Sequence, residues 1–369
     1  MNRRRRAPAP GPPPGDAEAQ PMEAEVLPGL APFARTELEA LPGASVAAAG
    51  RDPAADDAVP FEWTGDWAPL DRLRTVTAVN RMLRFAVPRP KALLGDAPFR
   101  RLAAALDAVT ARDPGGFAGV RLEAAGRDSA VMRRLRTALA DAAGLADDPE
   151  DGDLRVRVRP GRGGAEASGW EVLVRLTPRP LSARPWRACN LPGGLNACLA
   201  AACWDLLGVA AEQRVLNAMC GSATLLVERG VRGPAARLTG VDLDEAAILC
   251  GDANLRAAGV SAELVRADAT ATPWAAGAFD VVVADPPWGD AVGDAAQART
   301  LADGLLREAH RVLAPGGRLL VITHAVRAFE AARRAAGGAW EDLAELRVYH
   351  GGHRPVVRAL RAHAGPRDG

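Results

Sequence analysis

The sequence predicts an α/β protein: a parallel sheet with helices on both faces, preceded by two smaller α/β units. From about residue 190, strand-like and helix-like segments alternate, which is typical of a parallel sheet covered by crossover helices. Before that point, period-two segments such as residues 153–160 alternate with amphipathic ones. The chain has 369 residues, 48% of them hydrophobic, and this length predicts two or three domains with real cores.

Residues 1–22 are predicted to form a disordered arm, in which four consecutive arginines precede a stretch rich in proline and alanine. No apolar stretch follows the arginines, so the arm does not resemble a secretory signal. A solvated tail is favoured over a nucleic-acid-binding arm, because blocks of like charge are usually solvated.

The first ordered unit is predicted over residues 23–92. A short strand, residues 24–27, leads into a helix whose apolar positions are Leu30, Phe33, Leu38 and Leu41. The spacing of apolar residues over 70–87 predicts a second amphipathic helix. Together these elements predict a small α/β unit.

The second unit is predicted over residues 93–188, with antiparallel strands and helices on one face. Its predicted helices are residues 99–109 and 130–145, and its predicted strands are residues 119–126, 153–160 and 170–177. Between residues 154 and 187 the chain carries eight arginines and two glutamates, a net charge of +6 in a protein whose total is +1. Alternation places Arg155, Arg157 and Arg159 on one strand face, a candidate phosphate track.

The parallel sheet is predicted over residues 189–361, followed by a tail, residues 362–369. Its predicted strands are residues 214–220, 237–243, 262–269, 279–288 and 317–325, and its predicted helices are residues 222–231, 244–259 and 300–315. The last helix aligns Leu301, Leu305, Ala309 and Val312 in one stripe. Residues 347–350 and 354–361 are expected to form an antiparallel pair that closes the sheet edge.

Composition excludes several classes of function. The net charge of +1 gives no global basic field, so a nucleic-acid partner would need a local patch. The five cysteines form no C-x-x-C pair, which predicts reduced thiols in a cytoplasmic protein rather than a zinc site or a disulfide framework. No apolar run approaches the ~18 residues of a membrane span. The histidines 310, 324, 350, 353 and 363 lack ligand spacing and are interpreted as surface or packing residues, with His324 and His353 nearer the functional edge.

Ligands of such sheets bind beyond the carboxyl ends of the strands, so the residues at those ends are the candidate site. Asn217 to Thr224 follow the first strand, with Gly221 allowing close approach of the backbone. Asp242 ends the second strand and Asp268 the third. The stretch from Asn217 to Thr224 matches neither the phosphate loop nor the G-x-G-x-x-G motif, so S-adenosylmethionine is favoured over a dinucleotide. Helix caps or turn acids are the alternative interpretation of both aspartates.

The fourth strand ends in Asp285, Pro286, Pro287, Trp288 and Gly289. The prolines cannot extend a ladder, so they turn the chain out of the sheet and stiffen it. The Asp285 carboxylate and the Pro286 carbonyl are both acceptors, and their natural guest is an amine with two donors. Trp288 would stack on the flat ring that carries this amine. A rigid turn with a capping acid is the alternative.

In order and spacing, "VLNAMCGSATLLVERG", "GVDLD", "RADAT" and "DPPWG" resemble class I methyltransferases that act on exocyclic amines of bases. The lead-in with "PLSARPWR" is similar to the junction in THUMP-domain RNA methyltransferases, over about residues 23–361. The resemblance implies a Rossmann-like methyltransferase domain after ferredoxin-like (23–92) and THUMP (93–188) units. The cofactor residues that it implies are Asn217, Met219, Cys220, Gly221, Ser222, Thr224, Asp242, Asp268 and Asp285.

Two residues depart from the family pattern "DPMCGSGT". Asn217 replaces an acid that normally holds the cofactor's ammonium, so it keeps an acceptor but loses charge assistance. Ala223 adds a Cβ where the backbone is tight. Trp288 stands in place of the usual tyrosine or phenylalanine and keeps the stacking role, although it needs a larger pocket. Weakened cofactor binding is therefore one expectation, and a degenerate site in a noncatalytic RNA-binding homologue is an alternative.

The resemblance implies methylation of guanine N2 in tRNA, with Asp285, Pro286, Pro287 and Trp288 as the catalytic set. The expected partner is tRNA or another structured RNA, and the expected RNA-binding residues are Arg155, Arg157, Arg159, Arg184 and Arg187. The chain is expected to act as a monomer without metal or membrane. Three alternatives remain: a ribosomal RNA guanine or adenine N6 target, the noncatalytic homologue, and a small-molecule methyltransferase, which would leave the arginine-rich front half unexplained.

Overall fold

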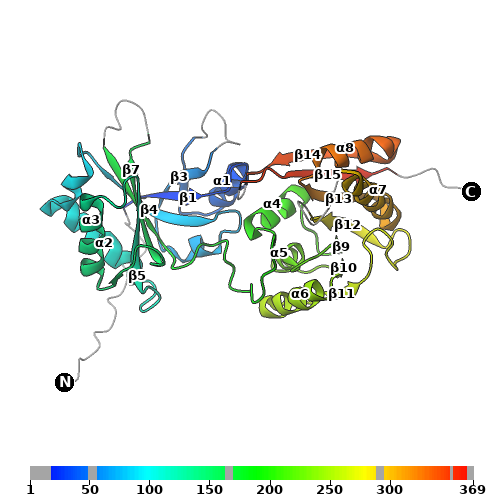
Figure 1. Ribbon diagram of the computed structural model, residues 1–369, viewed down its shortest axis with the longest axis horizontal. Helices are drawn as coiled ribbons and strands as arrows, with labels where there is room; N and C mark the ends of the chain where they lie inside the picture. Colours follow the sequence, from blue (N-terminus) through cyan, green and yellow to red (C-terminus); the bar gives the residue numbers. More distant parts are fainter. Residues whose placement is uncertain (1–17, 49–55, 163–168, 288–294, 350–351, 364–369) are drawn as a thin grey trace, which may run out of the picture. The chain divides into compact units, whose positions relative to one another are not determined.

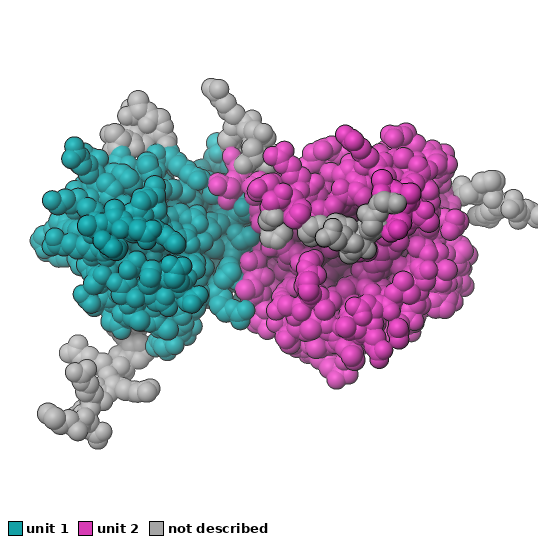
Figure 2. All heavy atoms as spheres, viewed as in Figure 1, with its two compact units in different colours: residues 1–26, 34–51, 58–181 teal, residues 27–33, 52–57, 182–369 magenta. Residues whose placement is uncertain are grey.

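The computed structural model describes residues 18–48, 56–162, 169–287, 295–349 and 352–363. The chain divides into two compact units (Figure 2). Unit 1 comprises residues 1–26, 34–51 and 58–181, and unit 2 comprises residues 27–33, 52–57 and 182–369. The mixed α/β fold class predicted from the sequence is confirmed.

Unit 1 is built on one eight-stranded sheet of order β2-β3-β1-β4-β8-β7-β5-β6. The strands are β1 (Gln20–Glu25), β2 (Ala44–Val46), β3 (Ala58–Trp63), β4 (Ala78–Phe85), β5 (Gly119–Ala124), β6 (Ala146–Asp147), β7 (Leu154–Pro160) and β8 (Trp170–Arg175). The helices of the front half are α1 (Ala31–Glu39), η1 (Ala68–Arg72), η2 (Pro90–Leu94), α2 (Asp96–Thr110) and α3 (Ala130–Ala143). The strands and helices predicted between residues 99 and 177 are confirmed. Their predicted antiparallel pairing holds for β7 and β8, whereas β5 pairs parallel with β7 and β6.

The prediction of a second amphipathic helix over residues 70–87 is wrong. Only η1 lies in its first part, and the rest forms β4, which pairs antiparallel with β1 on one side and with β8 on the other. Two neighbouring strands satisfy its backbone groups, and this tertiary pairing overrides the local apolar spacing. Because β8 lies beyond residue 92, the predicted boundary at that residue falls inside a continuous sheet.

The three arginines of β7 form ion pairs with carboxylates from other strands. These pairs are Arg155–Glu25, Arg157–Glu25, Arg157–Glu123, Arg159–Glu23 and Arg159–Glu171. Arg155 is only 9% exposed. These ion pairs engage the arginines within the sheet, and their predicted role as a phosphate track stays a prediction. The sequence pattern placed them on one face correctly but could not reveal which carboxylates the sheet sets opposite them.

Unit 2 is built on a seven-stranded sheet of order β11-β10-β9-β12-β13-β15-β14 (Figure 1). Its strands are β9 (Arg214–Ala218), β10 (Arg237–Asp242), β11 (Glu263–Arg266), β12 (Phe279–Ala284), β13 (Leu313–Thr323), β14 (Trp340–Arg347) and β15 (Val356–Ala362). Its helices are α4 (Ala197–Leu207), α5 (Thr224–Gly230), α6 (Glu245–Ala258), α7 (Ala295–Val312), α8 (Val326–Ala335) and η4 (Gly337–Ala339). Five of these strands, β9 to β13, run parallel to one another. The alternation predicted from residue 190 is thus confirmed.

The edge of this sheet differs in detail from the prediction. An antiparallel pair does close it, since β15 pairs with β13 and β14 pairs with β15. However, the first strand of the pair ends at Arg347 instead of beginning there, and His350 lies outside the described residues. Helix α4 was not predicted because nearly all of its residues are buried, which leaves no amphipathic stripe to detect.

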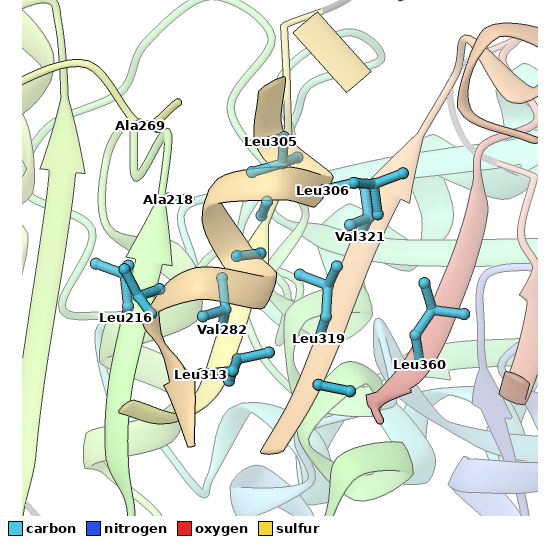
Figure 3. Close-up of a cluster of buried hydrophobic side chains, with 14 of the residues drawn as sticks. Leu216, Ala218, Ala269, Val282, Leu305, Leu306, Leu313, Leu319, Val321 and Leu360 are labelled. Atoms are coloured by element: carbon cyan, nitrogen blue, oxygen red, sulfur yellow. The ribbon is translucent and has the colours of Figure 1, made fainter. Parts of the chain in front are cut away.

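Helix α7 supplies much of the core beside the sheet (Figure 3). Its residues Leu305, Ala309 and Val312 are buried, as the predicted stripe required. They pack in one cluster with Leu216 of β9 and Leu319 of β13. Burying these apolar side chains fixes β9, β12 and β13 side by side, and their carboxyl ends carry the site. No helix in the described part of the chain is long and apolar enough to cross a membrane.

Candidate active site

The strand order reverses between β9 and β12. From β9 the chain moves outward through β10 to β11, and it then returns to place β12 on the other side of β9. In the paired register Ala284, the last residue of β12, lies opposite Ala218, the last residue of β9. The segments that follow these two residues therefore leave the sheet together. Ligands of doubly wound sheets bind at such a switch point.

The segment after β9 is a tight turn. Its backbone enters the left-handed region at Met219 (φ 54°), Gly221 (φ 51°) and Ala223 (φ 58°). The Cys220 N–H donates to the Val241 carbonyl at 2.9 Å, which ties the turn to β10. Two of the three left-handed residues are not glycines, so packing must hold them in this conformation.

A pocket of about 110 Å³, here called the glycine-loop pocket, opens above this turn. Seven of the nine predicted cofactor residues line it: Asn217, Met219, Cys220, Gly221, Ser222, Thr224 and Asp285. The opposite wall is the segment 191–195, which sequence reasoning did not single out. Ligand pockets usually measure about 300 Å³ or more, so this one would enclose one end of a ligand.

Asn217 brings an acceptor atom into this region. Its side chain is 1% exposed, and its Nδ2 donates to the carbonyl oxygens of Ala218 and Val283, each at 3.3 Å. Those two acceptors fix the orientation of the amide, because only the nitrogen can donate. The other end, Oδ1, is buried without a hydrogen-bond partner among the described residues. A buried acceptor left unpaired beside a pocket fits a ligand that carries an N–H donor, such as an ammonium group.

The two aspartates at the next strand ends behave differently. Asp242 accepts from the Gly221 N–H at 2.9 Å through Oδ2 and from the Asp244 N–H at 3.0 Å through Oδ1. It therefore adjoins the turn and keeps lone pairs for a ligand hydroxyl. Asp268 is exposed and accepts from the Thr270 N–H and Oγ1, both at 2.8 Å, as a turn residue does. It does not line the glycine-loop pocket.

Asp285 follows β12 and lines two cavities. One is the glycine-loop pocket, and the other is a cavity of about 270 Å³, here called the histidine pocket. The histidine pocket is lined by Gly193, Gly194, Leu195, Asn196, Leu199, Asp285, Ile322, His324, His353 and Pro355. The two cavities share Asp285 and residues 193–195, so a group on this carboxyl is accessible from both sides.

The Asp285 carboxyl has no cationic partner among the described residues. No ion pair or hydrogen bond in the described part of the chain involves it, and burial raises the pKa of Asp285 to about 7. Its negative charge in turn adds to the effect of burial in raising the pKa of the Cys203 thiol. A carboxyl with a pKa so far above its ordinary value, placed in a cleft, is a candidate functional group.

The remaining residues of the fourth-strand motif are only partly described. Pro286 and Pro287 leave the sheet as expected and line a small cavity with His324 and Phe329. Trp288 lies outside the described residues, so its predicted stacking role stays a prediction.

Arg184 and Arg187, predicted to bind RNA, are engaged within unit 2. Arg184 is 6% exposed and forms a buried ion pair with Glu228 at 3.0 Å. Arg187 donates to the Leu195 carbonyl at 3.0 Å and to Thr224 Oγ1 at 3.2 Å. It therefore joins the two walls of the glycine-loop pocket. Both side chains thus hold parts of unit 2 in place, and their predicted contact with RNA stays a prediction.

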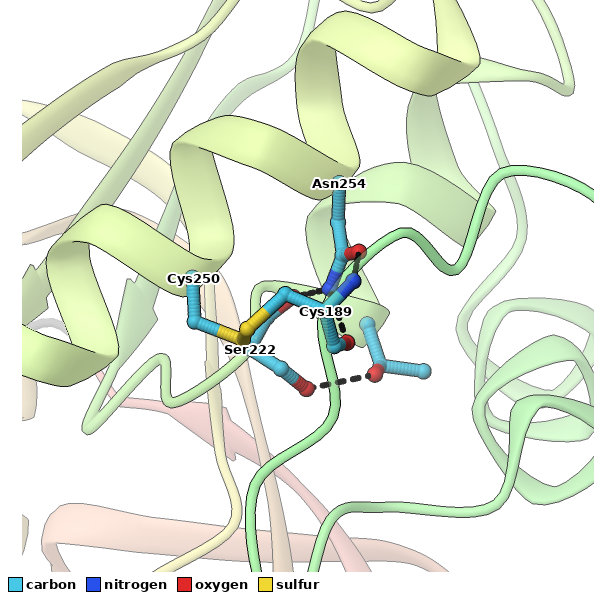
Figure 4. The surroundings of a disulfide bond; sticks show 5 residues. Cys189, Ser222, Cys250 and Asn254 are labelled. Atoms are coloured by element: carbon cyan, nitrogen blue, oxygen red, sulfur yellow. Dashed lines mark hydrogen bonds between the residues drawn. A yellow bond between two sulfur atoms is a disulfide. The ribbon is translucent and has the colours of Figure 1, made fainter.

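A disulfide joins Cys189 to Cys250, which corrects the prediction that all cysteines are reduced (Figure 4). The two residues are 61 positions apart, and only the fold brings α6 beside the segment that enters unit 2. Asn254, fully buried, completes the junction: it bonds the backbone of Cys189 at 2.9 and 3.1 Å and the Ser222 carbonyl at 3.0 Å.

The described residues contain no cluster of three or more His, Cys, Asp or Glu that could hold a metal ion.

Comparison with known families and curated proteins finds that the back half of the chain is similar to methyltransferases. Residues 184–356 match the RMKL-like methyltransferase domain family (UPF0020). A tRNA (guanine(6)-N2)-methyltransferase from Thermus thermophilus is 34% identical over 197 residues, 52% of this chain and 56% of that protein. A ribosomal RNA small subunit methyltransferase C from Chromohalobacter salexigens is 34% identical over 150 residues, 39% of this chain and 42% of that protein. The chain thus spans about half the length of these curated relatives.

A solved structure extends the likeness to the front half. The crystal structure of TrmN from Thermus thermophilus matches with a TM-score of 0.71 and 27% sequence identity, covering 93% of this chain and 99% of that chain. The match therefore includes the eight-stranded sheet of unit 1 as well as the sheet of unit 2.

Proposed function

We propose that this protein transfers a methyl group from S-adenosylmethionine to the N2 amine of a guanosine in tRNA. The observation that carries the proposal is the position of Asp285 at the junction of two cavities. A transfer between two bound molecules needs one site for the donor, one for the acceptor, and a shared opening. The name of the Thermus relative supports this reaction, and the description of the matched family supports methyl transfer.

The residues of the glycine-loop pocket fit one end of the methyl donor. Asn217 Oδ1 would accept from its ammonium group, and the turn at Gly221 would let the backbone approach closely. Asp242, adjoining the turn, would accept from ribose hydroxyls. When bound, S-adenosylmethionine supplies an electrophilic methyl group on a sulfonium and is left as a neutral thioether.

Asp285 would orient the acceptor amine. The lone pair of a guanine N2 amine is delocalised into the ring, which makes the nitrogen a poor nucleophile. Hydrogen bonds from the amine to the Asp285 carboxylate and the Pro286 carbonyl would favour a pyramidal nitrogen and direct its lone pair at the methyl group. These bonds strengthen as positive charge develops on the nitrogen, as catalysis requires. The proton released from N2 would pass to Asp285 or to water.

Unit 1 would supply the RNA contacts as a THUMP-like module, by analogy with the family. The ion-paired arginines of β7 leave this role to exposed basic side chains, such as Arg133 and Arg134 on α3. If these contacts are electrostatic, affinity for tRNA should fall steeply as salt is added. An RNA-modifying enzyme of this kind would work in the cytoplasm.

The test combines purified protein, methyl-labelled S-adenosylmethionine and tRNA from a strain that lacks the gene. Mass spectrometry of the nucleosides should detect N2-methylguanosine. The Asp285→Asn variant should lose most of the activity, and Asp280→Asn, at the opposite end of β12 and paired with Arg214, serves as a matched control. Near-normal turnover by Asp285→Asn would remove the role given to that carboxyl.

Ribosomal RNA is the second candidate substrate, because one relative is named for it. Offering ribosomal RNA and tRNA in parallel decides between them. If calorimetry detects no heat with S-adenosylmethionine and neither RNA is methylated, the chain is a noncatalytic homologue.

A further inference from the structure

The histidine pocket places two imidazoles beside Asp285. His324 follows the last residue of β13, and His353 precedes β15. Thr323 pairs with Val356 across these antiparallel strands, so the segments beyond the two paired residues adjoin each other. The rings meet edge to face, with centroids 5.7 Å apart. Strand pairing thus joins two histidines far apart in the sequence into one wall.

The rest of the pocket has few polar side chains. Leu195, Leu199, Ile322 and Pro355 give it apolar walls, and the Asn196 side chain is used to cap α4 by accepting from the Cys198 N–H at 2.8 Å. Among the described residues that line the pocket, the polar side chains besides Asn196 are the Asp285 carboxyl and the two imidazoles. Such a pocket, apolar with a few placed polar groups, suits a flat heterocycle.

We propose that His324 and His353 form the specificity wall of the base pocket, and that an imidazole N–H donates to O6 of the bound guanine. The inference rests on the proposed function, and it adds how the purine is chosen. With its N2 amine at Asp285, guanine offers O6 as a further acceptor, whereas adenine carries an amine at that position. An adenine would set its amine, a donor, against the imidazole N–H, which is also a donor.

If His324 and His353 only supported the fold, their variants would behave differently from variants that lose contact with the base. His324→Ala and His353→Ala should bind S-adenosylhomocysteine with unchanged affinity, as measured by calorimetry. Their kcat/KM for tRNA should fall about tenfold, the effect of losing one hydrogen bond to the base. His324→Asn keeps an N–H donor and should recover part of the loss. His310→Ala is the matched control, since His310 of α7 contacts Trp340 of β14 outside both pockets.

The decisive experiment changes the base as well as the histidine. Once the methylated position is mapped, a ligated tRNA can carry 2-aminopurine there, which keeps the N2 amine but lacks O6. The penalty of His324→Ala or His353→Ala should then disappear, because the variant removes a bond that this base no longer makes. An equal penalty on guanine and 2-aminopurine in both variants, or no penalty on either, overturns the inference.

These outcomes are separate from a failure of the proposed function. If the wild-type protein neither binds S-adenosylhomocysteine nor methylates RNA, the proposed function fails and the inference fails with it. If the wild-type protein is active and both histidine variants match it, the methyltransferase stands and only the specificity wall is wrong.

Discussion

The side-chain amide of Asn217 donates to the main-chain carbonyl of Val283 across the β9–β12 pair at 3.3 Å. This bond, just before Asp285, turns Oδ1 away from the carbonyls and leaves it buried and unpaired. Asn217 and Asp285 thereby line the same pocket from adjacent strands. The departure from the family acid at residue 217 keeps an acceptor in place while removing a second buried charge near Asp285.

Replacing Asn217 with aspartate should tighten binding of S-adenosylhomocysteine by about five- to tenfold, because hydrogen bonds to a charged acceptor are stronger by about 1 kcal/mol. Calorimetry measures this. The control ligand is 5′-methylthioadenosine, which lacks the ammonium and should bind both proteins equally. A similar gain for both ligands would show that residue 217 does not contact the ammonium.

The stability of the protein should depend on Asp285 in a particular direction. Burial raises the pKa of Asp285 to about 7, against about 3.9 in an unfolded chain. The folded state therefore holds a proton that the unfolded state releases above about pH 4, and this stabilising contribution is lost as the pH rises through 7. At about 1.4 kcal/mol per unit, the loss is at most about 4 kcal/mol. As the pH rises from 5 to 8, the unfolding free energy of Asp285→Asn should therefore increase relative to that of the wild type.

Urea unfolding of the wild type and of Asp285→Asn at pH 5 and pH 8 measures this change in unfolding free energy, because all other groups titrate alike in the two proteins. A constant difference in unfolding free energy would contradict the raised pKa. In the wild-type enzyme, kcat/KM should rise with pH through about 7, as the carboxylate acceptor forms.

Ala223 should be under backbone strain. Its φ of 58° lies in the left-handed region, and a left-handed residue other than glycine costs about 1 kcal/mol. Ala223→Gly is therefore expected to stabilise the protein by about 0.5–1 kcal/mol, seen as a higher melting temperature. Ala253→Gly in the interior of α6 is the matched control and should destabilise by about 1 kcal/mol. Equal losses in both variants would mean that the turn does not require a left-handed residue.

The Cys189–Cys250 disulfide should contribute to stability by restricting the unfolded chain. For a loop of this length, its removal is expected to cost about 2–4 kcal/mol. Dithiothreitol should lower the melting temperature of the wild type and leave that of the Cys189→Ser, Cys250→Ser double variant unchanged. The double variant still contains Cys198, Cys203 and Cys220, so any response to the reductant would point to one of those thiols.

Arg159→Ala should affect folding more than RNA binding. The change leaves Glu23, which is 2% exposed, without its ion-pair partner, and breaking a buried pair costs about 3–5 kcal/mol. Arg157→Ala, at a more exposed position on the same strand, should cost about 1 kcal/mol or less. Denaturant unfolding and tRNA binding measured in parallel check this. Normal stability with lost tRNA binding would support the phosphate track.

The sequence alone determined the elements of the parallel sheet and most of the glycine-loop pocket. These features are local: a strand must be apolar, a tight turn needs residues such as Gly221, and the carboxyl ends of parallel strands share one edge. Seven predicted cofactor residues therefore lie together, although Asp242 and Asp268 do not line the pocket with them.

Only the tertiary structure decided which partners these residues meet. Residues 70–87 carry a helical spacing, yet β4 forms because β1 and β8 satisfy its backbone on both sides. The arginines of β7 alternate as a binding strand would, but Glu23 and Glu25 reach them from β1. The pairing of β13 with β15 brings His324 and His353 together. Periodicity records which face a side chain takes, whereas the charge or ring opposite it depends on contacts between segments that are distant in the chain.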